Sequence, residues 1–259
     1  MANRAMDDEQ VAHLLELVKD ADSVELKVTV SDSGRPSVLE RLDVDPLDAQ
    51  IRQVYFFDTP DLDLDKAGVV VRARRVQGKG DDTVVKLRPV VPDELPPALR
   101  SLPEFGVEVD TMPGGSVCSA SLKGVPTKAT VRDAVAGRIP LRQIFTKDQR
   151  EFFAAHAPDG VGLDDLRVLG PIHVLKLKYT PPELARKIVG EMWLYPDGAR
   201  IIELSTKCST TEPFQVAAET RAFLSGKGVD LSGAQSTKTR TALEFFAREL
   251  KAADAAAAG

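Results

Sequence analysis

The sequence predicts an α+β protein built on an antiparallel β-sheet, which is either open with helices on one side or closed into a barrel. Two observations predict it. Strand-like runs follow one another in hairpin succession, without the regular alternation of strand and helix that a parallel sheet requires. Six of these runs also alternate apolar with charged residues, so each predicted strand has one apolar face and one charged face.

The strands fall into two groups that follow an N-terminal helix. Residues 7–20 carry apolar side chains at helical spacing and predict that helix. Runs of apolar and β-branched residues, bounded by turn residues, then predict the strands. The predicted strands are 23–30, 37–44, 51–59, 68–76, 82–90 and 104–110, and then 141–153, 172–180, 187–195 and 199–208.

The remaining segments predict connections and helices. Residues 113–126 read as a long irregular connection, and 127–138 as a helix that opens with a Thr cap. Two more helices are expected at 212–226 and 239–252. No repeat and no Gly/Ser-rich linker divides the chain, so residues 1–251 are expected to form one domain. Residues 252–259 are expected to be a disordered tail.

Composition excludes several classes of protein. The 259 residues are 43% hydrophobic and 28% charged, which is ordinary for a globular protein. A net charge of −5 gives no bulk attraction to duplex nucleic acid or an anionic membrane, so neither partner is expected. Cys118 and Cys208 have no metal or redox spacing, and the N-terminus has no apolar signal region. A cytoplasmic location is expected.

The charged faces of the strands allow two interpretations. In "VVVRARR", Arg72 and Arg74 oppose Val71 and Ala73. For one strand, a solvated polar face is the usual explanation. Across six strands the charged faces are dense in Lys and Arg, or in Asp and Glu, which favours a sheet curled around a polar lumen. The basic residues of such a lumen are Lys27, Arg72, Arg74, Lys86, Arg88, Lys176, Lys178 and Lys207.

A lumen of this kind suits a compact polyanion. Arginine and lysine hold phosphate oxygens by charge-assisted hydrogen bonds. Acidic residues in the same lumen could hold a hard divalent cation through oxygen ligands.

One segment identifies a known family. "YFFDTPDLDLDKAGVVVRARR" (55–75), followed by "DDTVVKLRP" (81–89), resembles the CYTH domain, also called the triphosphate tunnel metalloenzymes. More loosely, "VEVD", "KDQR", "IIELSTK" and "STKTRTALE" resemble later segments of the family. The resemblance implies a closed barrel of eight antiparallel strands with helices packed outside. It also implies a triphosphate-containing small molecule as ligand and Mg²⁺ or Mn²⁺ as cofactor.

The resemblance also implies roles for individual residues. Lys27, Glu25 and Arg150 fall at catalytic positions. Glu191 is a reserve candidate for holding metal or positioning water. The substrate-binding set, completed by strand alternation, is Lys27, Arg72, Arg74, Lys86, Arg88, Arg150, Lys176, Lys178 and Lys238. The metal-binding set is Glu25, Glu108, Asp110, Glu203 and Glu191.

Two serines depart from the family pattern. Ser23 stands where the family's opening motif has a glutamate, and Ser205 stands where a second acid often follows the equivalent of Glu203. Trp193 and Tyr195 lie where acids are common, and they are equally well explained as packing residues. Fewer carboxylates leave few ligands for a second metal ion, so polyanion binding is expected to survive better than catalysis.

Three functions remain open at this point. The first is a metal-dependent hydrolase that acts on a triphosphate. The second is a non-catalytic or weakly catalytic tunnel that binds polyphosphate or a nucleotide. The third is cyclisation of a nucleotide, as in class IV adenylyl cyclase. The lumen residues alone do not separate them.

Overall fold

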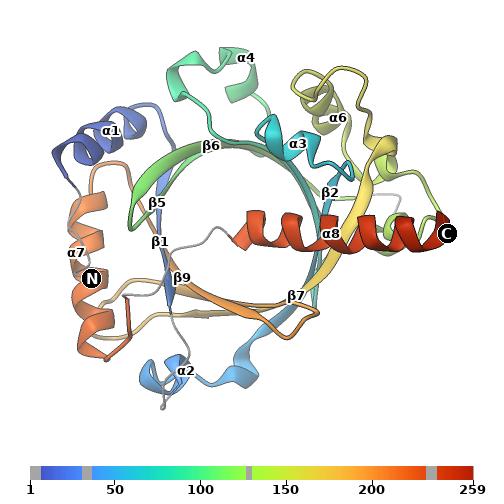
Figure 1. Ribbon diagram of the computed structural model, residues 1–259. Helices are drawn as coiled ribbons and strands as arrows, with labels where there is room; N and C mark the ends of the chain where they lie inside the picture. Colours follow the sequence, from blue (N-terminus) through green and yellow to red (C-terminus); the bar gives the residue numbers. More distant parts are fainter. Residues whose placement is uncertain (1–6, 31–36, 127–129, 232–237, 259) are drawn as a thin grey trace.

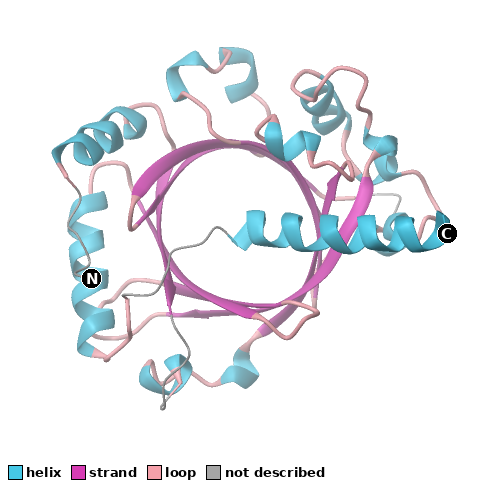
Figure 2. Cartoon of the chain, in the orientation of Figure 1, coloured by secondary structure: helices cyan, strands magenta, loops and turns pink. Residues whose placement is uncertain are grey.

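A computed structural model describes residues 7–30, 37–126, 130–231 and 238–258. Its centre is a closed β-barrel of nine strands in the order β1-β5-β6-β4-β3-β2-β7-β8-β9 (Figures 1 and 2). The strands are β1 (Ser23–Val30), β2 (Gln50–Asp58), β3 (Val69–Val76), β4 (Asp82–Leu87), β5 (Phe105–Met112), β6 (Gly115–Gly124), β7 (Arg167–Tyr179), β8 (Ile188–Leu194) and β9 (Arg200–Cys208).

The prediction of a closed barrel is therefore confirmed, but the count of eight strands and the purely antiparallel pairing are wrong. Strands β1 and β5 pair in parallel, with Ser23 opposite Glu108 and Glu25 opposite Asp110. The other neighbouring strands pair antiparallel. The parallel pair closes the barrel and brings two acidic segments, far apart in sequence, side by side.

Helices surround the barrel and cover its apolar outer face (Figure 1). The helices are α1 (Asp8–Val18), α2 (Val38–Arg41), α3 (Asp63–Lys66), α4 (Pro97–Arg100), α5 (Val131–Val135), α6 (Lys147–Ala154), α7 (Pro213–Gly226) and α8 (Lys238–Ala258). Short 3-10 turns lie at Pro46–Asp48, Pro92–Glu94, Leu141–Ile144 and Leu163–Asp165. No helix within the described ranges is long and apolar enough to cross a membrane.

The apolar alternate residues of the strands pack outward. Val71 and Leu87 share one buried cluster with Phe152 of α6. Leu26 packs with Leu14 of α1 in a second cluster. The charged residues between them must face the lumen, because neighbours along a strand point to opposite sides. This confirms the predicted direction of the apolar residues.

Helix α8 differs from the others because it lies across one opening of the barrel (Figure 1). Its Ala242 and Leu243 pack against Phe56 and Trp193. Phe56 is opposite Arg72 in the β2–β3 register, so it lies on the lumen side of the sheet. Apolar packing therefore fills part of this end of the barrel. The helix continues beyond the predicted domain end at residue 251 as far as Ala258.

Three segments differ from the predicted secondary structure. Residues 37–44 were expected to be a strand but contain α2, whose Ser37 and Glu40 form a capping box. Residues 113–126 were expected to be irregular but contain β6, which forms a hairpin with β5 through Gly114 in a left-handed conformation.

The helix expected at 127–138 is present as α5 with Thr130 as its cap, and residues 127–129 lie outside the described ranges.

The third error concerns 141–153, which was expected to be a strand and contains α6. A capping box of Thr146 and Gln149 starts this helix. The Gln149 side chain is buried, and its Nε2 donates to the carbonyl oxygens of Thr83 and Leu122 at 3.2 and 3.0 Å. Its Oε1 accepts from the Thr83 hydroxyl at 2.9 Å. The "KDQR" segment thus anchors a helix to the outside of β4 and β6.

Replacing this anchor is expected to destabilise the barrel wall. Gln149→Leu keeps the size of the side chain but removes its hydrogen bonds to the Thr83 and Leu122 carbonyls and to the Thr83 hydroxyl, which retains only a longer bond to the Gly124 carbonyl. We expect the free energy of unfolding in urea to fall by about 2–4 kcal/mol. Gln143→Leu, at an exposed position, is the matched control and should change it by less than about 0.5 kcal/mol. Equal stability of the two variants would contradict the anchoring role.

Candidate functional site

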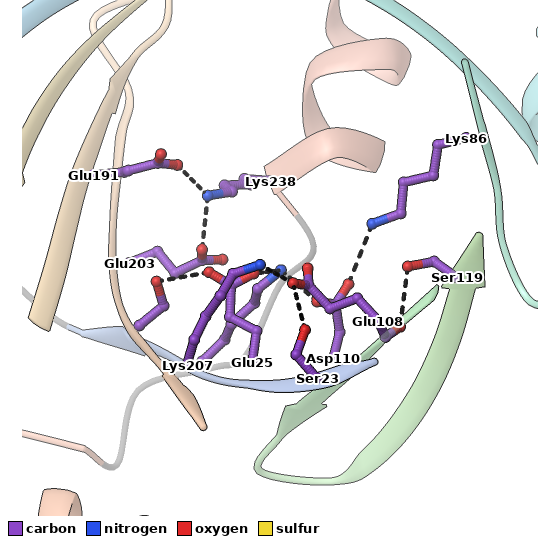
Figure 3. A network of polar contacts seen from close by, with 12 residues as sticks. Ser23, Glu25, Lys86, Glu108, Asp110, Ser119, Glu191, Glu203, Lys207 and Lys238 are labelled. Atoms are coloured by element: carbon purple, nitrogen blue, oxygen red, sulfur yellow. Dashed lines mark hydrogen bonds and ion pairs between the residues drawn. The ribbon is translucent and has the colours of Figure 1, made fainter. Parts of the chain in front are cut away.

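The lumen holds a network of charged side chains from β1, β3, β4, β5, β7, β8, β9 and α8. Figure 3 shows carboxylates of several strands pointing toward lysines of others. Contacts in the lumen connect residues that strand alternation had assigned to charged faces: Lys27 lies 2.7 Å and Lys86 3.5 Å from Asp110. Lys238 of α8, which the family resemblance had assigned to substrate binding, lies 2.7 Å from Glu203. The alternation of charge along the strands is therefore a property of the lumen.

Three carboxylates form the group best suited to a metal ion. One oxygen from each of Glu25, Glu108 and Asp110 lies within 4.8 Å of the others. Strand pairing explains this, because Glu25 is opposite Asp110 and Glu108 lies two residues before Asp110 on the same face. Of the five acids predicted as ligands, these three are brought together.

Asp110 is the most buried member of this group. Its side chain is fully buried and faces Lys27, Lys86 and Arg88, with the last two nearest to Oδ2 at 3.5 and 3.1 Å. Burial would raise the pKa of Asp110, but these three cations outweigh it and hold that pKa far below its usual value. The carboxylate is therefore ionised at neutral pH.

Lys27 lies between two of the carboxylates. Its Nζ is 2.7 Å from Asp110 and 3.1 Å from Glu25. Burial would lower the pKa of Lys27, but Asp110, Glu25 and Glu203 outweigh it and raise that pKa well above its usual value. The same ion pairing lowers the pKa of Glu25 despite its burial. Lys27 thus stays protonated, and Glu25 is a weak base.

The two serines that depart from the CYTH pattern contact carboxylates of the three-carboxylate group. The Ser205 hydroxyl donates to Glu25 at 3.0 Å, and the Ser23 hydroxyl lies 3.5 Å from Glu108 Oε2. Lys207 forms an ion pair with Glu108 at the edge of the same group. Both serines therefore lie beside the candidate metal ligands, as the departure from the family pattern predicts.

Glu191 and Glu203 form a second acidic pair, opposite each other on β8 and β9. Lys238 of α8 contacts both, at 2.5 Å from Glu191 and 2.7 Å from Glu203 (Figure 3). Lys176 lies 2.7 Å from Glu191, and the Trp193 indole donates to the same carboxylate at 3.2 Å. Burial would raise the pKa of Glu191, but Lys238 and Lys176 hold it well below its usual value.

The wall formed by β2 and β3 is basic. Arg72 is half-buried, and its Nε atom is buried without a hydrogen-bond partner among the described residues. Burial and the neighbouring Arg74 lower the pKa of Arg72 to about 10. Arg74 forms an ion pair with Asp82 at 2.7 Å. Arg52 is buried on β2, and its pKa is lowered by burial and by Arg74.

Sequence analysis missed Arg52. Its side chain contacts the Gln50 side-chain oxygen at 2.7 Å. The alternating residues that follow it, Val54 and Phe56, are apolar, and the β2–β7 register shifts between these two residues. The face of β2 therefore gave no repeated charge to predict from. The place of Arg52 follows only from the β2–β3 register of the structure, in which Val54, two residues after Arg52, lies opposite the lumen residue Arg74.

The other predicted residues have mixed outcomes. Lys178 lies in register with Val189, which is opposite Ser205, so it belongs to the lumen side and is exposed there. Arg150 does not belong to the lumen. It lies on α6 outside the barrel, where it is exposed and donates to the Phe145 carbonyl at 2.7 Å. The strand that was expected to carry Arg150 into the lumen is a helix.

The three-carboxylate group fits a divalent cation. Asp110 Oδ2 is buried, accepts no hydrogen bond from the described residues and has Arg88 and Lys86 at 3.1 and 3.5 Å. Carboxylate oxygens are the ligands that Mg²⁺ and Mn²⁺ prefer, and three carboxylates converge here. Glu25, Glu108 and Asp110 are the residues that would hold the ion.

Comparison with known proteins shows which fold this is. No family model matches the sequence, and no curated protein matches it. Among solved structures, a putative adenylate cyclase from Bacillus halodurans has a TM-score of 0.58 at 12% identity, over 85% of this chain and 97% of that one. The putative adenylyl cyclase HpAC1 from Hippeastrum, described as having a dominant triphosphatase activity, has a TM-score of 0.57 at 18% identity, over 82% of this chain and 91% of that one.

The chain therefore has the barrel fold of these proteins, which agrees with the CYTH resemblance read from the sequence. At identities this low the likeness shows the fold. The lumen residues carry the argument about function.

The ion pairs of Asp110 predict a pH dependence of stability. Because the folded pKa lies below the usual value of 3.8, ionised Asp110 stabilises the fold above that pH. This contribution is lost as the pH falls below about 4. Asp110→Asn should lower the free energy of unfolding at pH 7 by about 3–5 kcal/mol, since it leaves buried cations unpaired. The variant should also show a smaller fall in the free energy of unfolding as the pH is lowered below about 4.

The measurement is urea unfolding from pH 7 to the lowest pH at which the protein folds. Asp164→Asn, at an exposed carboxylate paired with Arg142, is the control and should cost about 1 kcal/mol or less. A variant as acid-sensitive as the wild type would show that Asp110 does not govern this part of the pH profile.

Proposed function

We propose that this protein binds a triphosphate in the barrel lumen and hydrolyses one of its phosphoanhydride bonds with the help of a divalent cation. The observation that carries the proposal is the cluster of Arg52, Arg72 and Arg74. Among the described residues, Asp82 is the carboxylate that forms an ion pair with this cluster, through Arg74, and the Arg72 Nε is buried without a hydrogen-bond partner. A buried donor that lacks a partner is costly unless a ligand satisfies it, and guanidinium groups fit phosphate oxygens.

The lumen is asymmetric in a way that suits a linear polyanion. Arginines lie on β2 and β3, while Lys86 of β4 and Arg88, directly after this strand, continue the basic wall toward Asp110. A chain of phosphates along this wall would reach from the arginine cluster to the three carboxylates. Glu25, Glu108 and Asp110 would hold a divalent cation at this end, where its charge would help to offset the charge that develops on the leaving group.

The pKa shifts assign roles within this proposal. Lys27 stays protonated, so it neutralises phosphate charge and does not act as a base. The lowered pKa of Glu25 makes it a weak proton acceptor and a better metal ligand. Arg150, on the outer helix α6, has no part in this site.

Two alternatives use the same lumen. The serines beside Glu25 and Glu108 reduce the number of anionic metal ligands, which favours slow turnover or binding alone. Cyclisation of a nucleotide remains the third function. The dominant triphosphatase activity described for HpAC1 supports placing hydrolysis ahead of cyclisation.

The arginine cluster predicts the binding phenotype. Arg72→Met should weaken binding of inorganic triphosphate at least about tenfold, because one charge-assisted contact is worth about 1.5–3 kcal/mol. The measurement is isothermal titration calorimetry without metal. Arg75→Met is the matched control, since Arg75 lies on the same strand three residues later, faces outward and donates to Gln53.

Arg150→Ala should likewise leave the dissociation constant unchanged. If Arg75→Met weakens binding as much as Arg72→Met does, the anion is not held in the lumen by this face of β3.

The catalytic part of the proposal is tested by product analysis. We expect orthophosphate from inorganic or organic triphosphate with Mg²⁺ or Mn²⁺, and no cyclic nucleotide from ATP. Ser23→Glu should raise turnover at saturating triphosphate and steepen its dependence on Mn²⁺, because it adds a carboxylate beside Glu108.

Ser101→Glu, at an exposed position outside the barrel, is the control for added charge. Binding without any product would leave the tunnel as a polyphosphate-binding protein. A Ser23→Glu variant slower than a rapid wild type would contradict the depletion of metal ligands.

A further inference from the structure

Glu191 and Glu203 are two largely buried glutamates that face each other in the lumen. The two glutamates are directly opposite each other on β8 and β9, and their side chains are only 15% and 8% exposed. Like charges in direct cross-strand contact are destabilising, and more so where little water screens them. A cation between them is therefore required for both to remain ionised.

Lys238 supplies that cation. Its Nζ contacts one oxygen of each carboxylate, at 2.5 and 2.7 Å. It also lies over the Trp193 ring, 5.0 Å from the centroid. The lysine comes from the first turn of α8, not from a barrel strand, and α8 is fixed against β2 and β8 by apolar packing. The ammonium group is thus held between the carboxylates by several independent contacts.

The rest of the pair is also satisfied. Lys176 contacts Glu191 at 2.7 Å, and the Trp193 indole donates to its second oxygen. The three-carboxylate group of Glu25, Glu108 and Asp110 also has a lysine, Lys27, between two of its members, Glu25 and Asp110. It differs from the Glu191–Glu203 pair because it offers a third acidic ligand, so carboxylate oxygens remain for a metal ion beside the lysine. The two acidic groups are therefore not equivalent cation sites.

We propose that the Lys238 ammonium takes the place of a second divalent cation between Glu191 and Glu203, so that the lumen holds one metal ion, at Glu25, Glu108 and Asp110. The inference rests on the proposed function, because it assumes that the lumen binds a divalent cation. It gives Glu191 and Glu203 the role of positioning Lys238 beside the bound phosphates, in place of the role of metal ligands.

The test of this inference measures the number of metal ions bound per molecule and does not depend on turnover. Mn²⁺ binding to the full chain, followed by electron paramagnetic resonance of the free ion, should give one site per wild-type molecule. Lys238→Met should give two, the second weaker, since Glu191 and Glu203 then face each other without their shared cation. Lys238→Met combined with Glu203→Gln should return the number to one.

Lys178→Met is the matched control, because it removes a lumen lysine away from the pair and should leave one site. Near-ultraviolet circular dichroism checks that each variant is folded. Lys238→Gln is the second variant. Its amide retains a hydrogen-bond donor, but it has no positive charge, so the second Mn²⁺ ion should still bind.

The outcomes separate the inference from the proposed function. Two Mn²⁺ ions in the wild type, or one in both the wild type and the folded Lys238 variants, overturn the inference and leave metal-dependent hydrolysis standing. No Mn²⁺ bound by the wild type overturns the metal dependence of the proposed function itself.

Discussion

Charge balance inside a closed barrel is the constraint on which the rest of this structure depends. Strand alternation places every second residue in the lumen, and many of these residues are ionised. Burying a charge is costly unless an opposite charge lies nearby. The structure meets this requirement with pairs that cross between elements: Lys27 with Asp110, Lys238 with Glu203, and Lys176 with Glu191.

The balance is incomplete at one wall, which is where the proposed polyanion would bind. Arg72 and its neighbours on β2 and β3 have little carboxylate to pair with, and the Arg72 Nε has no partner in the described structure. The excess positive charge is held in place by a rigid sheet whose outer face is packed under helices. A polyanion would complete the balance, so binding and stability are expected to be coupled.

Two non-local connections decide how the acids are used. Parallel pairing of β1 with β5 builds the three-carboxylate group from segments that are more than 80 residues apart. Helix α8 brings Lys238 to the pair formed by β8 and β9. The carboxylates are therefore arranged in two ways: Glu25, Glu108 and Asp110 converge as a group of three, whereas Glu191 and Glu203 form a pair that shares Lys238.

The sequence by itself determined the face of most lumen residues. Alternation in "VVVRARR" and "TVVKLRP" predicted that Arg72, Arg74 and Lys86 face inward, because side chains two apart in a strand share a face. It failed where a local pattern was ambiguous. "SVLERLDV" and "KDQREFF" contain apolar residues at spacings compatible with strand or helix, and capping boxes at Ser37 and Thr146 start helices there. That misreading placed Arg150 in the lumen.

Tertiary structure alone decided the partners. Strand order around the barrel decides which carboxylates meet. It also sets the parallel pairing of β1 with β5 and brings Arg52 to the arginine cluster. Strand order is set by packing and closure, which join residues distant in the chain, and alternation within one strand carries no information about its neighbours. The sequence therefore fixed neither the pairing of the acids nor the position of Lys238 between two of them.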